Sequence, residues 1–292
     1  MSPLKRPVAV VTDSASDITP EQARQHDVRV VPLCVTFPDR SYLDGVELRA
    51  EEFYEKLVET GEIPITSQPS PSAFTDAFRE KLDAGYDVVC LTISSRLSGT
   101  YQSACLARDL LEPEEQERIR VFDTLNLCIG ELLLVRMAVR MRNDGLAADT
   151  IVATLEHLRG RVRLVALFDT LKYLQKGGRI PAGVAFAGKM LSIKPVIGCE
   201  KGKIAILGKA RGSKHGQNMI VKMIDKYGGV SYDRPIHFCY TGMSDGLLRK
   251  YLRDNEDLYG TFSDDLPINC AGATIGTHAG PGAIAFAFFS RE

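Results

Sequence analysis

The stretch VVCLTISSRLSGTYQSACLARDLL, residues 88–111, contains the pattern on which the predicted fold rests. Its apolar run from Val88 to Ile93 has the length of a buried strand, and the residues from Tyr101 to Leu111 have the spacing of a helix. A buried strand that leads directly into a helix is the repeating unit of a parallel sheet covered by helices. The stretch therefore predicts an α/β fold.

The same alternation of strand and helix continues through the first half of the chain. Strands are expected at Val8–Val11, Val28–Phe37 and Ile119–Phe122, and helices at Glu51–Thr60, Ser72–Leu82 and Glu131–Met141. After Gly160 the pattern changes, because the apolar runs Pro195–Cys199 and Ile204–Leu207 flank EKGK and predict a hairpin. Other strands in this half are expected at Leu164–Phe168, Ile236–Tyr240 and Ile284–Phe289, with helices at Ala182–Leu191 and Gln217–Tyr227. We predict two α/β domains, residues 1–160 with a mostly parallel sheet and residues 161–292 with a mixed or antiparallel sheet.

The composition restricts the possible function classes. The chain of 292 residues carries 36 basic and 37 acidic side chains, a formal net charge of -1. Sequence-independent binding of nucleic acid normally requires a basic excess, so no nucleic-acid partner is expected. No run of about eighteen apolar residues occurs, so stable membrane insertion is not expected either. Seven scattered cysteines without a CxxC pair, and a start that does not look like a signal peptide, indicate a reducing cytoplasm and no metal site.

The seam between the strand and the helix of residues 88–111 holds more hydroxyl groups than a helix cap requires. Its polar residues are Ser94, Ser95, Ser98 and Thr100, with Gly99 among them. A helix N-terminus has unpaired N–H groups and a partial positive charge, and one hydroxyl is enough to cap it. The surplus hydroxyls, and a glycine that lets another group approach the backbone, favour a site for a carboxylate or phosphate over capping alone.

Two further polar loops precede or follow predicted elements. ITSQPSPSAF, residues 65–74, places Thr66 and Ser67 before a helix. Alone it predicts a helix cap with a proline turn, and beside the first seam it suggests a second wall of a polar pocket. TDSASD, residues 12–17, follows the first strand, and we interpret Asp13 and its neighbours as formers of Asx turns. A doubly wound sheet brings such loops together at the carboxyl edge of its strands, where ligands bind.

The second half of the chain offers two candidate cations and one candidate tunnel wall. Arg179 follows a glycine pair, and His278 lies in the glycine-rich segment HAGPGA. Arginine can hold an oxyanion through two parallel hydrogen bonds, although both residues are equally compatible with a structural or surface role. The helix predicted at residues 182–193 is apolar on nearly all sides, so it is either buried between layers or part of a tunnel. The tunnel candidates are Phe186, Met190 and Ile193.

Several motifs of catalytic sites are missing from the sequence. It contains no GxxxxGK[ST], no GxGxxG after the first strand, no GxSxG and no HExxH. The polar residues are suited to holding an anion and poorly suited to making or breaking bonds. We therefore predict no catalytic residue, no metal and no cofactor.

Six motifs in register resemble the DegV family of bacterial fatty-acid-binding proteins. They are TDSASDI, TSQPS, SSRLSGTYQSA, DTLKYLQKGGRI, KPVI and HAGPGA, spread from residue 12 to residue 283. The resemblance implies a two-domain α/β protein that binds one long-chain fatty acid. It also implies a partner, because family members of Gram-positive bacteria deliver the fatty acid to a separate ATP-dependent fatty acid kinase. That kinase makes an acyl-phosphate for phospholipid synthesis.

The resemblance also assigns roles to particular residues. The positions that it assigns to the carboxylate are Thr66, Ser67, Ser95, Ser98, Gly99, Arg179 and His278. Which of Ser95 and Ser98 makes the closer contact stays open. The family often has threonine after the histidine, whereas this chain has Ala279. GKARGSKHG, residues 208–216, resembles a basic region that docks the kinase, and it makes Arg211 the docking candidate.

The function predicted on this basis is that of a cytoplasmic, non-catalytic carrier. It would bind a long-chain fatty acid and present its carboxylate to the kinase. The alternative is a phosphotransferase or hydrolase that acts on a small phosphorylated metabolite, and a lipid-sensing regulator would share the same pocket. The sequence leaves open the preferred chain length and saturation, the oligomeric state and any regulatory role.

Overall fold

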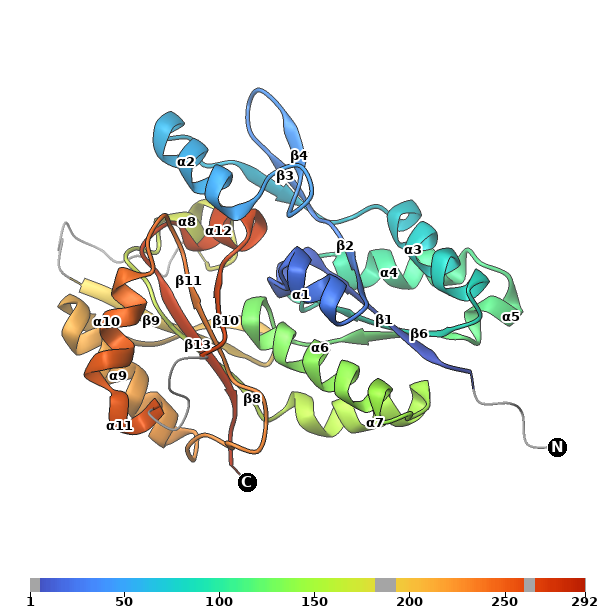
Figure 1. Cartoon of the computed structure of the whole chain (residues 1–292). Helices are drawn as coiled ribbons and strands as arrows, with labels where there is room; N and C mark the ends of the chain where they lie inside the picture. Colours follow the sequence, from blue (N-terminus) through green and yellow to red (C-terminus); the bar gives the residue numbers. More distant parts are fainter. Residues whose placement is uncertain (1–5, 182–192, 260–265, 292) are drawn as a thin grey trace.

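The computed structural model describes residues 6–181, 193–259 and 266–291 of the chain. One parallel sheet and one mixed sheet lie side by side, with helices packed on both (Figure 1). The predicted α/β class with these two kinds of sheet is thereby confirmed. The division at residue 160 stays a prediction. Within the described residues, no helix combines the length and the apolar character needed to cross a bilayer.

The parallel sheet contains four strands in the order β2-β1-β6-β7. They are β1 (Val8–Asp13), β2 (Val28–Val31), β6 (Asp87–Thr92) and β7 (Ile119–Asp123). The helices that cover its two faces are α3 (Pro71–Asp83) and α4 (Thr100–Asp109) on one side and α6 (Cys128–Asn143) and α7 (Ala148–Arg159) on the other. Because both faces are covered, all six residues of β1 are buried. This explains the near-continuous apolar runs that identify these strands in the sequence.

The mixed sheet contains six strands in the order β10-β9-β8-β13-β11-β12, and only β11 and β12 pair in parallel. They are β8 (Val162–Leu167), β9 (Ile193–Glu200), β10 (Lys203–Arg211), β11 (His237–Tyr240), β12 (Ile268–Cys270) and β13 (Ile284–Phe289). The predicted EKGK hairpin is confirmed, since β9 and β10 pair antiparallel across it. The helix α9 (Gly212–Lys226) packs against β8, β9 and β10. The helix predicted at Ala182–Leu191 falls outside the described residues.

The helix α6 lies between the two sheets (Figure 1). It contacts β1 and β6 of the parallel sheet and β8, β11 and β13 of the mixed sheet. Most of its side chains are consequently buried. A helix packed on two sides requires apolar residues around most of its circumference, which accounts for its sequence.

The prediction of one strand from Val28 to Phe37 is wrong. The chain leaves the parallel sheet after β2, and β3 (Cys34–Thr36) joins a separate antiparallel sheet in the order β4-β3-β5. The other strands of this small sheet are β4 (Ser41–Leu43) and β5 (Ile65–Ser67). Pro32 has no N–H to continue the ladder, and the Leu33 N–H donates to Ser14 Oγ at 3.0 Å. An apolar run interrupted by a proline therefore became two strands in two sheets.

The remaining described helices lie between or around these sheets (Figure 1). They are η1 (Ser14–Ser16), α1 (Pro20–Gln25), α2 (Ala50–Thr60), α5 (Pro113–Gln116), α8 (Lys172–Lys176), α10 (Gly246–Asp254), α11 (Glu256–Tyr259) and α12 (Ala273–Ala279). Of these, α12 is central to the site, because it contacts α2, α8 and β3.

Candidate functional site

An apolar cavity lies between the mixed sheet and a cover formed by α12, the start of α6 and the loop that joins β6 to α4. The cavity has a volume of about 870 Å³, part of which is open to solvent. Its cover is formed mainly by the aliphatic residues Leu33, Ile93, Leu97, Leu127 and Ile275.

The floor of the cavity is a row of side chains that lie opposite one another across four neighbouring strands. From β11 to β9 the row contains Cys239, Ala285, Ala166 and Ile197. Residues paired across strands point to the same face of a sheet. The two alanines at the middle of the row rise little above the sheet and leave a trough. Ala285 remains half-buried in an interior strand because its methyl group faces this space.

Four polar side chains meet at one corner of the cavity: Thr66 of β5, Ser98 after β6, Arg179 after α8 and His278 of α12. Thr66 Oγ1 and His278 Nε2 lie 2.9 Å apart and share a hydrogen bond. Apart from Thr241 and Thr274, the remainder of the lining consists of apolar residues, two cysteines and a glycine. The cavity is therefore apolar over most of its wall and polar at this corner.

Arg179 is held in this corner by backbone carbonyl groups. Its Nε donates to the Leu97 carbonyl at 3.3 Å and its Nη1 donates to the Gly177 carbonyl at 2.6 Å. Burial lowers the pKa of Arg179, and no carboxylate in the described part of the chain contributes to that pKa. An arginine keeps its charge in proteins, so the corner carries a half-buried cation that lacks an acidic counterpart there.

His278 is neutral at physiological pH. Burial, assisted by the nearby charge of Arg179, lowers the pKa of His278 to about 4. Its Nδ1 is buried without a hydrogen-bond partner among the described residues, and the ring packs so closely on Gly177 that a Cβ there would lie 2.2 Å from Nδ1. The imidazole can therefore offer a donor or an acceptor without adding a second charge.

The hydroxyl-rich seam after β6 is largely used by the fold itself. Ser94 Oγ donates to the Gly202 carbonyl at 2.7 Å, which attaches the seam to the β9–β10 hairpin. The Ser95 N–H donates to Asp123 Oδ1 at 3.1 Å. Ser98 Oγ lies 2.8 Å from Thr100 Oγ1, and it alone of these three serines lines the cavity. Of the hydroxyls that suggested an anion site, that of Ser94 therefore stabilises the fold and that of Ser98 lines the cavity.

The other predicted head-group residues lie beside the corner and not in the cavity wall. Ser67 is exposed, Ser95 is half-buried, and neither lines the cavity. Gly99 faces the side chain of Gln68, whose Oε1 would lie 2.0 Å from a Cβ at this position. The glycine therefore admits a side chain of the neighbouring loop at this point.

Among the tunnel and docking candidates, Ile193 and Arg211 lie apart from this cavity lining. Ile193 begins β9, where it pairs with Arg211 and does not line the cavity. Phe186 and Met190 lie outside the described residues. Arg211 is exposed at the end of β10, directly before α9.

A group of buried carboxylates joins the loops around the site. Asp13 accepts from the Ala15 N–H at 2.9 Å, which confirms the predicted Asx turn, and from the Ile93 N–H at 2.8 Å. Asp44, which the sequence analysis did not single out, accepts from the N–H groups of Ala273 and Thr274 at 3.0 and 3.3 Å. It therefore caps α12, the helix that carries His278. Its only sequence signal is its position in a turn, where aspartate is common.

The chain matches the model of the family described as "Uncharacterised protein, DegV family" over residues 7–291. A DegV domain-containing protein of Caldanaerobacter subterraneus is 34% identical, with 98% of this chain and 99% of the relative covered. One from Deinococcus radiodurans is 35% identical over 96% of this chain and 97% of the relative.

Two solved structures share the fold along nearly the whole chain. A fatty-acid-binding DegV family protein from Thermus thermophilus has a TM-score of 0.85 and 33% identity, with 98% of this chain and 100% of that chain covered. A stearic acid-binding protein from Eubacterium ventriosum has a TM-score of 0.86 and 29% identity, with 97% and 98% covered. By sequence and by fold, this chain belongs to the DegV family.

Proposed function

We propose that the chain binds one long-chain fatty acid, with the acyl tail in the apolar cavity and the carboxylate at its polar corner. The observation that carries this proposal is an almost entirely apolar cavity with one corner formed by Thr66, Ser98, Arg179 and His278. Structural relatives described as fatty-acid-binding and stearic acid-binding proteins support it. A pocket for a small phosphorylated metabolite would need polar groups around most of its wall, so the alternative is disfavoured.

The tail supplies most of the binding free energy. Burial of about fifteen methylenes at ~0.8 kcal/mol each contributes roughly 12 kcal/mol. Association costs on the order of 4–15 kcal/mol, so little of this contribution is surplus. The polar corner then mainly orients the carboxylate. Arg179 compensates its charge, while the hydroxyls and the neutral imidazole complete its hydrogen bonds.

The most direct test is the identity of any molecule that the protein carries. The purified chain should release a single fatty acid on denaturation, in an amount close to one per chain, and native mass spectrometry should show the same added mass before denaturation. A lipid-free preparation that does not take up oleate, or a polar metabolite in its place, would contradict the proposal.

The proposal extends to the fate of the bound fatty acid. In this view the chain is a non-catalytic, cytoplasmic carrier that presents the carboxylate to a separate ATP-dependent fatty acid kinase. The acyl-phosphate product would supply phospholipid synthesis. Phosphate transfer to bound oleate should then require the kinase, ATP and magnesium together. Conversion of ATP by this chain alone would contradict a carrier role.

Removing both corner hydroxyls should affect orientation more than affinity. In the double variant Thr66→Ala with Ser98→Ala, we expect fatty-acid affinity to fall by no more than about 30-fold, because each of the two hydrogen bonds contributes only about 1 kcal/mol. Phosphate transfer by the kinase should fall considerably further, since the carboxylate is no longer held in one position. The matched control is Ser67→Ala with Ser95→Ala, which removes two hydroxyls outside the cavity wall. Equal effects of the two double variants would refute this assignment.

Reversing the charge of Arg211 tests the docking surface. The variant Arg211→Glu should keep its lipid and raise the KM for the carrier in the kinase assay at least tenfold, because a cation and its acidic partner become like charges. Arg79→Glu provides a matched control, since Arg79 is exposed on α3 beside the parallel sheet. Acyl-phosphate production that is unchanged in Arg211→Glu would remove this residue from the docking surface.

A further inference from the structure

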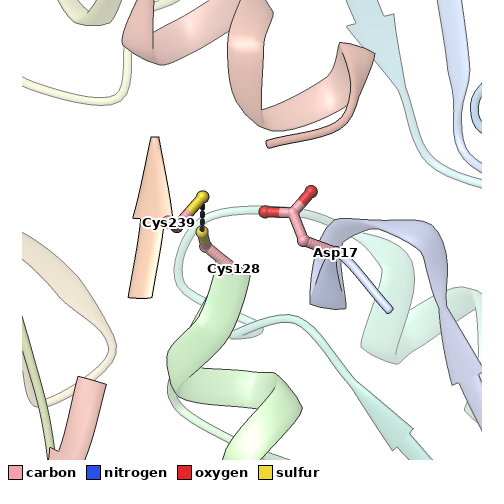
Figure 2. Close-up of side chains that lie close together, drawn as sticks. All are labelled: Asp17, Cys128 and Cys239. Carbon is pink, nitrogen blue, oxygen red and sulfur yellow. Dashed lines mark hydrogen bonds between the residues drawn. The ribbon is translucent and has the colours of Figure 1, made fainter. Parts of the chain in front are cut away.

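Three buried side chains with metal-binding atoms meet at the end of the cavity floor (Figure 2). Asp17 follows η1, Cys128 is the first residue of α6, and Cys239 lies in β11. The two sulfur atoms are 4.0 Å apart, and one carboxylate oxygen lies within 4.8 Å of both. Figure 2 shows the carboxyl group of Asp17 directed towards the two sulfurs.

The sulfur–sulfur separation is close to that of a tetrahedral zinc site, whereas the carboxylate oxygen, which lies within 4.8 Å of the sulfurs, would have to move inward. Zn–S bonds of about 2.3 Å and Zn–O bonds of about 2.0–2.2 Å place neighbouring ligand atoms roughly 3.5–3.8 Å apart. The observed sulfur–sulfur distance of 4.0 Å requires only a small inward rotation to reach this geometry. Two thiolates and one carboxylate are a donor set that suits zinc.

The carboxyl group of Asp17 interacts with the Cys128 thiol, and only one of its two oxygens has a backbone donor. Its Oδ1 accepts from the Gly272 N–H at 2.8 Å, which fixes the orientation of the group. Its Oδ2 is buried without a hydrogen-bond partner among the described residues. A metal ligand typically shows this arrangement, in which a second hydrogen bond orients the group whose free lone pair faces the ion.

Asp17, Cys128 and Cys239 are all buried. A buried acidic group costs free energy unless a cation or hydrogen bonds compensate it. A divalent cation would compensate the carboxylate and both thiolates at once.

We propose that Asp17, Cys128 and Cys239 form a zinc site with three protein ligands. The fourth coordination position of the zinc ion would face the cavity. The cavity-facing position follows from the two cysteines, which both line the cavity. Binding of Zn²⁺ would displace the two thiol protons and any proton on Asp17, with no change of oxidation state. The three ligands come from distant parts of the sequence, with 111 residues between the two cysteines. No short sequence motif therefore indicates the site. The proposal does not depend on the lipid function.

The test uses the full reduced chain after treatment with a chelator, both as purified and after extraction of lipid. Zn²⁺ and Co²⁺ should each bind at one ion per chain, and the Co²⁺ form should show thiolate charge-transfer and tetrahedral ligand-field absorption. Cys128→Ser and Cys239→Ser should each weaken binding by about 100-fold or more, since losing a ligand costs at least as much as losing a second-shell partner. Cys34→Ser and Cys105→Ser, which change half-buried thiols elsewhere, should leave it unchanged.

Asp17→Asn should weaken binding as well, and the two cysteine variants decide the question if this variant does not fold. The proposal is overturned if neither preparation binds Co²⁺ with thiolate absorption. It is also overturned if binding is insensitive to both cysteine substitutions, or if the purified chain contains a Cys128–Cys239 disulfide, visible as a mass loss of about 2 Da.

Discussion

Replacing Ala285 with phenylalanine should reduce fatty-acid binding by more than a hundredfold while the protein stays folded. Ala285 lies in the middle of the cavity floor, paired with Ala166 on β8 and Cys239 on β11. An aromatic ring at this position would stand in the trough that the two alanines leave. Ala285 and Ala166 have the smallest side chains of this row, so a ring in place of Ala285 would obstruct the path of the acyl chain.

The size of the effect follows from the methylenes that the ring excludes. If about four methylenes lose their site at ~0.8 kcal/mol each, the loss is about 3 kcal/mol, which exceeds a hundredfold in affinity. Displacement of a fluorescent fatty acid measures the affinity, and far-ultraviolet circular dichroism with a thermal melt reports the fold. Ala285→Val should give an intermediate loss, because it adds two methyl groups and no ring.

A matched control comes from the opposite face of the same sheet. Ala205 lies on the edge strand β10, and the alternation of side chains along the strand directs it away from the face to which Ile204 and Ile206 belong. Ala205→Phe should therefore leave fatty-acid affinity within about twofold, although the change of side chain is the same. If both phenylalanine variants bind oleate as tightly as the unchanged protein, the acyl chain does not lie on this floor.

The fold could be predicted from sequence where one local pattern determined the structure. The run of residues 88–93 became β6, and the EKGK turn became the β9–β10 hairpin, because apolar length and turn residues act over a few positions. The split of the predicted strand at Val28–Phe37 depended on where the chain goes after Pro32. The pairing of β3 with β4 and β5 cannot be read from the local pattern of residues 28–37. Pro32 was the one local sign against a continuous strand, because proline is rare inside a sheet.

The site was harder to predict because its parts are distant in the sequence. Thr66 and His278 are 212 residues apart and meet only through the packing of α12 on β5. The sequence indicated which loops are polar, but it could not distinguish Ser94 from Ser98. In the fold, the Ser94 hydroxyl donates to a backbone carbonyl group, whereas Ser98 lines the cavity. The cavity floor could not be predicted from the sequence, because a small apolar residue such as Ala285 looks the same there as a residue of a packed hydrophobic core.

Substituting Asp44 with alanine should destabilise the protein by roughly 3–5 kcal/mol. Asp44 is buried, with 3% of its surface exposed. Its Oδ2 accepts from Ser14 Oγ at 2.9 Å and from the Thr274 N–H at 3.3 Å, while its Oδ1 accepts from the Ala273 N–H at 3.0 Å. Alanine would leave these donors without that acceptor, and each unsatisfied buried donor costs about 1–3 kcal/mol.

The expected loss is large because Asp44 joins three separate segments. It lies after β4, and its partners are in η1 after β1 and at the start of α12. A total stability of about 5–15 kcal/mol is usual for a folded protein, so this one change would remove a substantial part of it. Urea unfolding followed by circular dichroism measures the difference, with the slope of the transition compared between variants.

The matched control is Asp39→Ala, which removes an acid from the turn between β3 and β4. Asp39 is 58% exposed and forms a salt bridge of 2.9 Å with Lys56, an interaction worth at most about 1 kcal/mol at a surface. Asp44→Asn should fall between the two, because its one remaining oxygen can still accept while its NH₂ group faces other donors. If Asp44→Ala is no less stable than Asp39→Ala, the three hydrogen bonds of Asp44 do not hold α12 in place, and the position of His278 must depend on the packing of α12 against α2 and α8.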